Sequence, residues 1–273
     1  MDFLGRTLAS RIRKMYLPGG EDVDWDAELR EISEPLFSAA AEFAVAELAL
    51  LGSTAGETPV CWIPSGNMQH STEVFHRELS ERGKPALVVG GDLVSELVRA
   101  AGEKLGWQYF YDQSSLDGNP PPGYPVLERP LETKSLHELT GCGKQPVLVA
   151  ANALKPPLEA SSAHLVYDRL GATWHAAYQL ESLLDRQLAA FDKVLVPGGL
   201  LLIDSSNPAE VTKLSAKIST YDRILRCRTQ NCNFSPEKIH PKDGVWQGPR
   251  YSFEAEPIET AAGEEYIRLK KIA

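Results

Sequence analysis

The sequence lacks any apolar run of the roughly 20 residues that a membrane-spanning helix requires. Its first 17 residues carry scattered basic side chains instead of a basic start followed by an apolar block, which a secretory signal would have. The 4 cysteines have no Cys-x-x-Cys or zinc-finger spacing, so they predict neither a disulfide framework nor a metal site. We therefore expect a cytoplasmic protein with reduced thiols, no membrane contact and no bound metal.

The chain also lacks an excess of basic residues. It has 28 Lys and Arg against 37 Asp and Glu, for a formal net charge of -9. Nucleic-acid binding normally needs a concentrated basic face, so this balance disfavours such a partner. With 273 residues, of which 43% are hydrophobic and 24% charged, the chain can bury one main core and an accessory layer. A small molecule is the expected partner, and the sequence leaves the oligomeric state open.

Three short apolar runs lie in the second half of the chain, and each is too continuous for a strand with one wet face. They are Val147–Ala151, His164–Tyr167 and Leu200–Ile203. Such runs are typical of interior strands of a parallel sheet. Between the second and the third, Ala176–Val194 repeats apolar residues at helical spacing. Pro197, Gly198 and Gly199 follow, and they predict the end of the helix and a turn into the next strand. The pattern predicts a β-α-β unit.

Further elements are expected before and after this unit. Strands are predicted at Thr58–Ile63 and Ala86–Leu93, and helices at Ser71–Arg82 and Ser95–Leu105. The Pro-, Gly- and Asn-rich stretch near residues 112–130 has no periodicity, which indicates an insertion. Near the end, residues 250–257 and 265–272 alternate apolar and polar side chains around a Gly-containing turn, and this pattern predicts an antiparallel hairpin.

Residues 1–57 precede the first expected strand and form an N-terminal extension. Met1–Leu17 and Ala27–Leu51 both have helical patterns. These helices would cover either a face of the sheet or a substrate site. The main domain would then be residues 58–273, with a second insertion near 223–248, where polar and aromatic residues suit either a small-molecule wall or an ordinary surface loop.

An acidic residue, Asp92, ends the second predicted strand. In parallel sheets a carboxylate at this position often binds a ribose, because it can accept two hydrogen bonds from neighbouring hydroxyls. The alternative is that Asp92 caps the helix predicted at Ser95–Leu105, since Asp is a favoured cap residue. The sequence leaves both interpretations open.

Four motifs follow one another in a recognisable order. They are Gly90-Gly91-Asp92-Leu93, Ala151-Asn152-Ala153-Leu154-Lys155-Pro156-Pro157, Ala163–Arg169 and Val194–Gly199. Their order and spacing over about residues 58–206 resemble the class I S-adenosylmethionine-dependent methyltransferases. The resemblance implies an α/β fold: a Rossmann-like, seven-stranded, mostly parallel sheet with helices on both faces and a C-terminal antiparallel hairpin. The cofactor S-adenosyl-L-methionine would lie across the carboxyl ends of the strands.

The resemblance also implies a role for individual residues at these strand ends. Asp92 would hold the ribose, and Leu93 would pack against the adenine ring. Asn152 would hydrogen-bond the adenine amino group, and Ala153 would contribute its backbone amide. These four residues form the predicted nucleoside part of the site.

The methionine part of the cofactor would lie nearer the first strand. The resemblance implies that a turn formed by Ser65, Gly66 and Asn67 approaches the methionine part. The residues that would border the sulfonium are Asp168, Arg169 and Leu170.

Methyl transfer needs aligned reactants and, for some acceptors, a base. His175 is the candidate base, with Asp168 to orient it, and Trp174 is a candidate to stack on the acceptor. A structural role suits His175 at least as well, and a tryptophan in this position is more often part of the core. The resemblance implies methyl transfer to a small-molecule acceptor. One alternative is a catalytically inactive partner subunit, which the single glycine in place of a glycine-rich loop favours. A nucleotide-dependent oxidoreductase is the other, although the chain has no Gly-x-Gly-x-x-Gly at the first turn.

Overall fold

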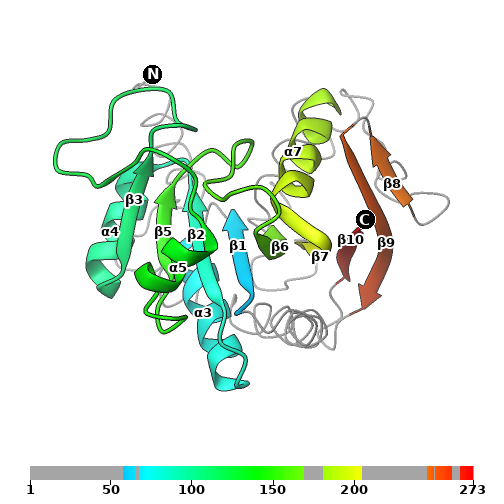
Figure 1. The fold of residues 1–273 in the computed structure, drawn as a ribbon, viewed down its shortest axis with the longest axis horizontal. Coiled ribbons are helices and arrows are strands. Elements are labelled where there is room, and N and C mark those ends of the chain that lie inside the picture. Colours follow the sequence, from blue (N-terminus) through cyan, green and yellow to red (C-terminus); the bar gives the residue numbers. More distant parts are fainter. Residues whose placement is uncertain are drawn as a thin grey trace, which may run out of the picture.

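The computed structural model describes residues 58–64, 68–168, 181–204, 245–248, 250–259 and 265–272. These residues form one mixed β-sheet with helices on both of its faces (Figure 1). The strands are β1 (Val60–Pro64), β2 (Leu87–Asp92), β3 (Gln108–Asp112), β4 (Val126–Leu127), β5 (Val147–Ala150), β6 (Ala163–Asp168), β7 (Leu195–Asp204), β8 (Val245–Gly248), β9 (Tyr251–Glu259) and β10 (Glu265–Lys271). The helices are α3 (Met68–Glu81), α4 (Ser95–Leu105), α5 (Thr133–Leu139) and α7 (Glu181–Val194).

The parallel part of the sheet is built around β1, which pairs with β2 on one side and β6 on the other. Next to β2 lies β5, and next to β6 lies β7, all in the same direction. In chain order, these five strands are arranged 3-2-1-4-5, as in doubly wound nucleotide-binding folds. The direction of winding therefore reverses between β1 and β6.

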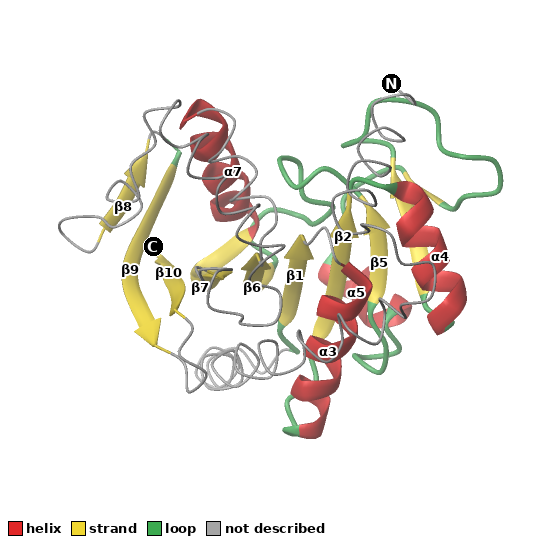
Figure 2. Cartoon of the chain, turned by 180° about the vertical axis from the view of Figure 1, so that it is seen from behind, coloured by secondary structure: helices red, strands yellow, loops and turns green. Residues whose placement is uncertain are grey.

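The antiparallel part confirms the predicted hairpin. Strand β10 pairs with β7, opposing Ile267 to Ile203, and β9 pairs with β10 in turn. Figure 2 shows β8, β9 and β10 at the end of the sheet opposite α4.

Among the described residues the sheet has ten strands, where seven were expected. Two of the additional strands, β4 and β8, fall inside the predicted insertions. The third, β3, pairs with the outer side of β5 and carries β4 at the edge. A strand of two residues has no periodicity to detect, and pairing over long sequence distances is a tertiary property, so the sequence patterns did not reveal these strands.

Both faces of the parallel strands are buried, which explains their continuous apolar runs. Along β1, Cys61 and Ile63 pack with the α3 side chain Phe75, whereas Val60 and Trp62 belong to the cluster on the other face. That second cluster contains three α7 residues, Leu188, Phe191 and Val194. Burying each large apolar side chain contributes roughly 1.5–3 kcal/mol. The packing of α3 and α7 against the two faces of the sheet therefore stabilises the fold.

The helix predicted at Ser95–Leu105 is confirmed at both ends as α4. It stops at Gly106, whose φ of 67° and backbone bond to Gly102 make it a left-handed cap. Downstream, α7 passes directly into β7, and the predicted turn at Pro197-Gly198-Gly199 is instead a bulge within that strand. The pairing shifts there from Ala163 with Leu195 to Leu165 with Leu200, and Gly198 has a φ of 76°.

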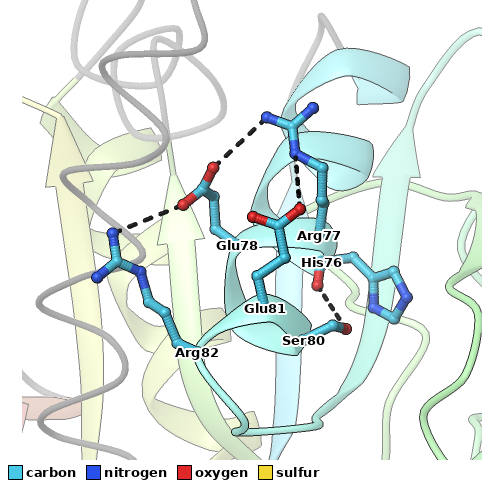
Figure 3. Close-up of polar contacts among 6 residues, drawn as sticks. All are labelled: His76, Arg77, Glu78, Ser80, Glu81 and Arg82. Carbon is cyan, nitrogen blue, oxygen red and sulfur yellow. Dashed lines mark hydrogen bonds and ion pairs between the residues drawn. The ribbon is translucent and has the colours of Figure 1, made fainter.

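The C-terminal half of α3 carries a surface network of charges (Figure 3). Glu78 pairs with Arg77 at 3.4 Å and with Arg82 at 3.6 Å, and the Ser80 hydroxyl donates to the His76 carbonyl at 2.8 Å. Exposed pairs of this kind contribute about 0–1 kcal/mol each. They stabilise the end of α3 that lies away from the carboxyl ends of the strands (Figure 1).

The predicted extension at residues 1–57 and residues 223–244 of the second insertion lie outside the described residues. Within the described ranges, no helix has both the length and the apolarity to cross a membrane.

Candidate functional site

The carboxyl ends of the parallel strands meet at one edge of the sheet, toward which the arrowheads of β1, β2, β3 and β5 point in Figure 1. Polar residues lie at four of these ends. They are Asp92 after β2, Asp112 after β3, Asn152 two residues beyond β5, and Asp168 after β6. In doubly wound sheets ligands bind outside this edge, where the winding reverses, so the edge is the candidate site.

Asp92 is buried, with 9% of its surface exposed, and only one of its carboxylate oxygens is hydrogen-bonded. Its Oδ1 accepts the Val94 N–H at 2.8 Å, while Oδ2 has no partner within the described structure. The N-cap of α4 is Val94 and makes no side-chain bond, so Asp92 is not the helix cap that one interpretation of the sequence suggested.

Burial raises the pKa of Asp92 from 3.8 to about 6, because desolvation disfavours the charged carboxylate. The backbone N–H groups of Val94 and Leu93 act in the opposite direction, but they offset only part of the effect. Hydroxyl groups of a ligand would supply the donors that the described residues do not, since a buried unpaired acceptor is costly.

Asn152 lies beside Asp92, as the prediction requires. Asp92 is paired with Ala150, and its carbonyl accepts the Ala151 N–H at 2.8 Å, so Asn152 is the next residue along the neighbouring strand end. The Asn152 Oδ1 accepts the Leu154 N–H at 3.0 Å, which closes a short turn. The carboxylate and the amide are therefore neighbours at the same edge.

Two further predicted residues flank this pair. Leu93 is 59% exposed, and Leu97, one turn later on α4, is 48% exposed. Ala153 is half-buried against the core, and its carbonyl accepts the Gln187 side chain of α7 at 2.8 Å. Leu93 thus offers an apolar surface directly beside a buried carboxylate, as a planar ring of a ligand would require.

Asp168 lies at the end of β6, separated from β2 by β1, and its side chain is fully buried. It is on the other side of the point where the winding reverses. The remaining predicted residues lie outside the described part of the chain. They are Ser65, Gly66, Asn67, Arg169, Leu170, Trp174 and His175.

Asp112 is a buried polar residue at the same edge that the sequence analysis missed. It is 1% exposed, its Oδ1 accepts the N–H and hydroxyl of Ser114 at 2.9 and 2.6 Å, and its Oδ2 has no partner among the described residues. Ser115, which follows Ser114, accepts the Asn152 N–H at 3.2 Å through its hydroxyl oxygen. The signal in the sequence was an acidic residue at the end of the aromatic run Tyr109–Tyr111, comparable to the acidic residue that ends the apolar run before Asp92.

The described residues contain no group of three or more His, Cys, Asp or Glu side chains arranged to hold a metal ion. Of the thiols in this part of the chain, Cys61 is buried and Cys142 is exposed, and both are free.

No family model and no curated protein matches the sequence. Solved structures of similar fold include a protein provisionally described as an S-adenosyl-L-methionine-dependent methyltransferase from Methanococcus maripaludis. It is 13% identical, with 94% of this chain and 98% of that one covered and a TM-score of 0.47.

Two others are the DszA carbon methyltransferase and an O-methyltransferase family protein from Burkholderia thailandensis. The first is 12% identical over 85% of this chain and 53% of its own, with a TM-score of 0.45. The second is 11% identical over 90% and 57%, with a TM-score of 0.44. This chain spans little more than half the length of these two. At such identities and TM-scores the similarity indicates neither an activity nor a substrate for this chain.

Proposed function

We propose that the protein binds S-adenosyl-L-methionine at the carboxyl edge of its sheet and transfers the methyl group to a small-molecule acceptor. The observation that carries the proposal is the buried Asp92 carboxylate, which has one oxygen without a partner among the described residues and ends the strand next to the one that leads to Asn152. A nucleoside presents hydroxyls at one end and a base at the other, which matches a carboxylate and an amide on neighbouring strands.

The described residues fit the nucleoside part of the cofactor. Asp92 would accept hydrogen bonds from the ribose hydroxyls, and this would satisfy Oδ2. Leu93 would pack against the base and lose its exposure to water. Asn152 would bind the edge of the base, and Ala153 would border it.

The bound cofactor would supply a methyl group on a positively charged sulfur, and the protein's task is to align the acceptor with it and exclude water. Asp168 is near the reversal of winding, where the methionine part would lie. We further propose that Ser65, Gly66 and Asn67 hold that part, and that Arg169 and Leu170 border the sulfonium. His175 would take a proton from the acceptor, oriented by Asp168, and Trp174 would stack on the acceptor.

The strand order weighs against a dinucleotide-dependent oxidoreductase. Dinucleotide folds continue the order 3-2-1-4-5 with a sixth parallel strand. Here the strand next to β7 is β10, which runs antiparallel. The closing strands thus favour the methyltransferase over this alternative.

Isothermal titration of the full chain with S-adenosylmethionine, S-adenosylhomocysteine and NAD tests the proposal. We expect heat with both sulfur nucleotides and none with NAD. Asp92→Ala should weaken binding of both by about 1–3 kcal/mol, the cost of losing a charged hydrogen-bond partner. Absence of binding by either sulfur nucleotide would refute the function, whereas binding without transfer to any component of a metabolite extract would indicate the inactive partner subunit.

A further inference from the structure

The segment 113–125, between β3 and β4, lies at the same edge as the proposed nucleoside site (Figure 1). It begins with a tight turn, in which the Asp112 carbonyl accepts the N–H groups of Ser115 and Leu116 at 3.3 and 3.1 Å. The Ser114 contacts to the Asp112 carboxylate hold the same turn from its other side. These hydrogen bonds fix the backbone conformation at Ser115.

The far end of this segment is held against α4. The Tyr124 hydroxyl donates to the Ser95 carbonyl at 3.1 Å. The Arg99 guanidinium lies 4.8 Å from the centre of the Tyr124 ring and donates to the Pro122 carbonyl at 3.2 Å. Since Ser95 begins α4 just after Asp92 and Leu93, both ends of the segment are fixed to the residues that form the site.

Ser115 contacts Asn152 directly. It is 5% exposed, and its hydroxyl oxygen accepts the Asn152 N–H at 3.2 Å. Because the Ser115 side chain is buried, its loss would leave the Asn152 N–H without this acceptor. Ser115 thus fixes the backbone of the residue that is expected to bind the base.

The side chain of Asn152 is fixed as well. Because the Asn152 Oδ1 accepts the Leu154 N–H, the position of the amide oxygen is defined. A flipped amide would place its NH2 group against the Leu154 N–H, so that two donors would face each other. Oδ1 keeps one lone pair for a ligand, and the described structure contains no partner for the Nδ2 donors. The amide therefore presents an acceptor beside a donor in one orientation only.

We propose that Ser115 is a specificity-determining positioning residue, which together with the Leu154 N–H locks the Asn152 amide so that it selects the base. The inference rests on the proposed nucleoside site. Adenine offers an amino donor next to a ring-nitrogen acceptor and matches the locked amide. Hypoxanthine has a carbonyl oxygen in place of the amino group, so Oδ1 would face an acceptor, and the lock prevents the amide from turning.

The test is isothermal titration of the full chain with S-adenosylhomocysteine and its deaminated analogue S-inosylhomocysteine. The unmodified protein should bind the adenine form about ten- to a hundredfold more tightly. Ser115→Ala should reduce this ratio about fivefold or more, and Ser115→Thr, which keeps the hydroxyl, should restore it. Ser114→Ala is the matched control, because it alters the same turn without removing a bond to Asn152, and its ratio should stay unchanged.

Asn152→Asp provides a second readout that does not depend on Ser115. It keeps the bonds to the Ser115 hydroxyl and the Leu154 N–H but removes the donor, so the ratio should fall close to one. If Ser115→Ala weakens both ligands by the same factor, Ser115 has a structural role only and the proposal fails. Equal binding of the two ligands by the unmodified protein overturns this inference alone, whereas binding of neither overturns the proposed function with it.

Discussion

Replacing Asp92 by Asn should make the protein more stable at neutral pH while it weakens ligand binding. Burial raises the pKa of this carboxyl from 3.8 to about 6, so the folded protein holds the proton more tightly than the unfolded chain does. The difference is about 2 pKa units, and at 1.36 kcal/mol per unit it corresponds to about 3 kcal/mol.

The sign follows from proton linkage. Between pH 4 and 6 the folded state binds more protons at Asp92 than the unfolded state, so the free energy of unfolding falls as the pH rises. Above pH 6 the carboxylate is charged in both states, and the loss reaches its full value. Asp92→Asn keeps an oxygen to accept the Val94 N–H but carries no charge, so it avoids this loss.

Urea unfolding at several pH values between 4 and 8 measures the effect. The difference in free energy of unfolding, variant minus unmodified protein, should grow by about 3 kcal/mol from pH 4 to 7 and then stay constant. Leu93→Ala is the control, because it changes the same site without removing a titrating group, and its curve should run parallel to that of the unmodified protein. A constant difference for Asp92→Asn across the whole pH range would refute the reasoning.

Three more outcomes are expected. Affinity for S-adenosylhomocysteine should fall about tenfold between pH 7 and pH 5, because ribose hydroxyls donate to the ionised Asp92; calorimetry at both pH values would show it, and equal affinities would contradict it. Gly91→Ala should destabilise by about 1–3 kcal/mol or more in urea, because a methyl group there overlaps the Trp62 ring; an unchanged midpoint would show that the ring can move away. Tyr251→Phe should cost about 0.5–1.5 kcal/mol in the same assay, because it removes the 2.7 Å bond from the hydroxyl to Asp185, and no loss would mean that water replaces the bond.

Local patterns predicted the parallel strands and their helices well. The continuous apolar runs of β1, β2, β5 and β6 are buried on both faces, as a parallel sheet with helices on each side requires. Helix α4 was predicted to the residue, because apolar spacing defines its body and Gly106 ends it. Features that arise within a few neighbouring residues are thus readable from the sequence.

Strand pairing was not readable in the same way. The strand β3 follows α4 in the chain, yet β5, which comes about 40 residues later, takes the place beside β2. As a result Asn152 lies next to Asp92, while Asp112 is one strand further out. The choice between these two strands depends on packing over the whole sheet, and no local pattern encodes it.

The sequence by itself determined that polar residues follow β2, β5 and β6, because apolar continuity and a polar residue after a strand are properties of short stretches. Only the tertiary structure decided that one oxygen of Asp92 has no donor in the part of the chain that the structure describes, that burial raises the pKa of Asp92 to about 6, and that Ser115 and Leu154 fix Asn152. These properties depend on burial and on hydrogen bonds between distant segments, which exist only once the sheet has formed.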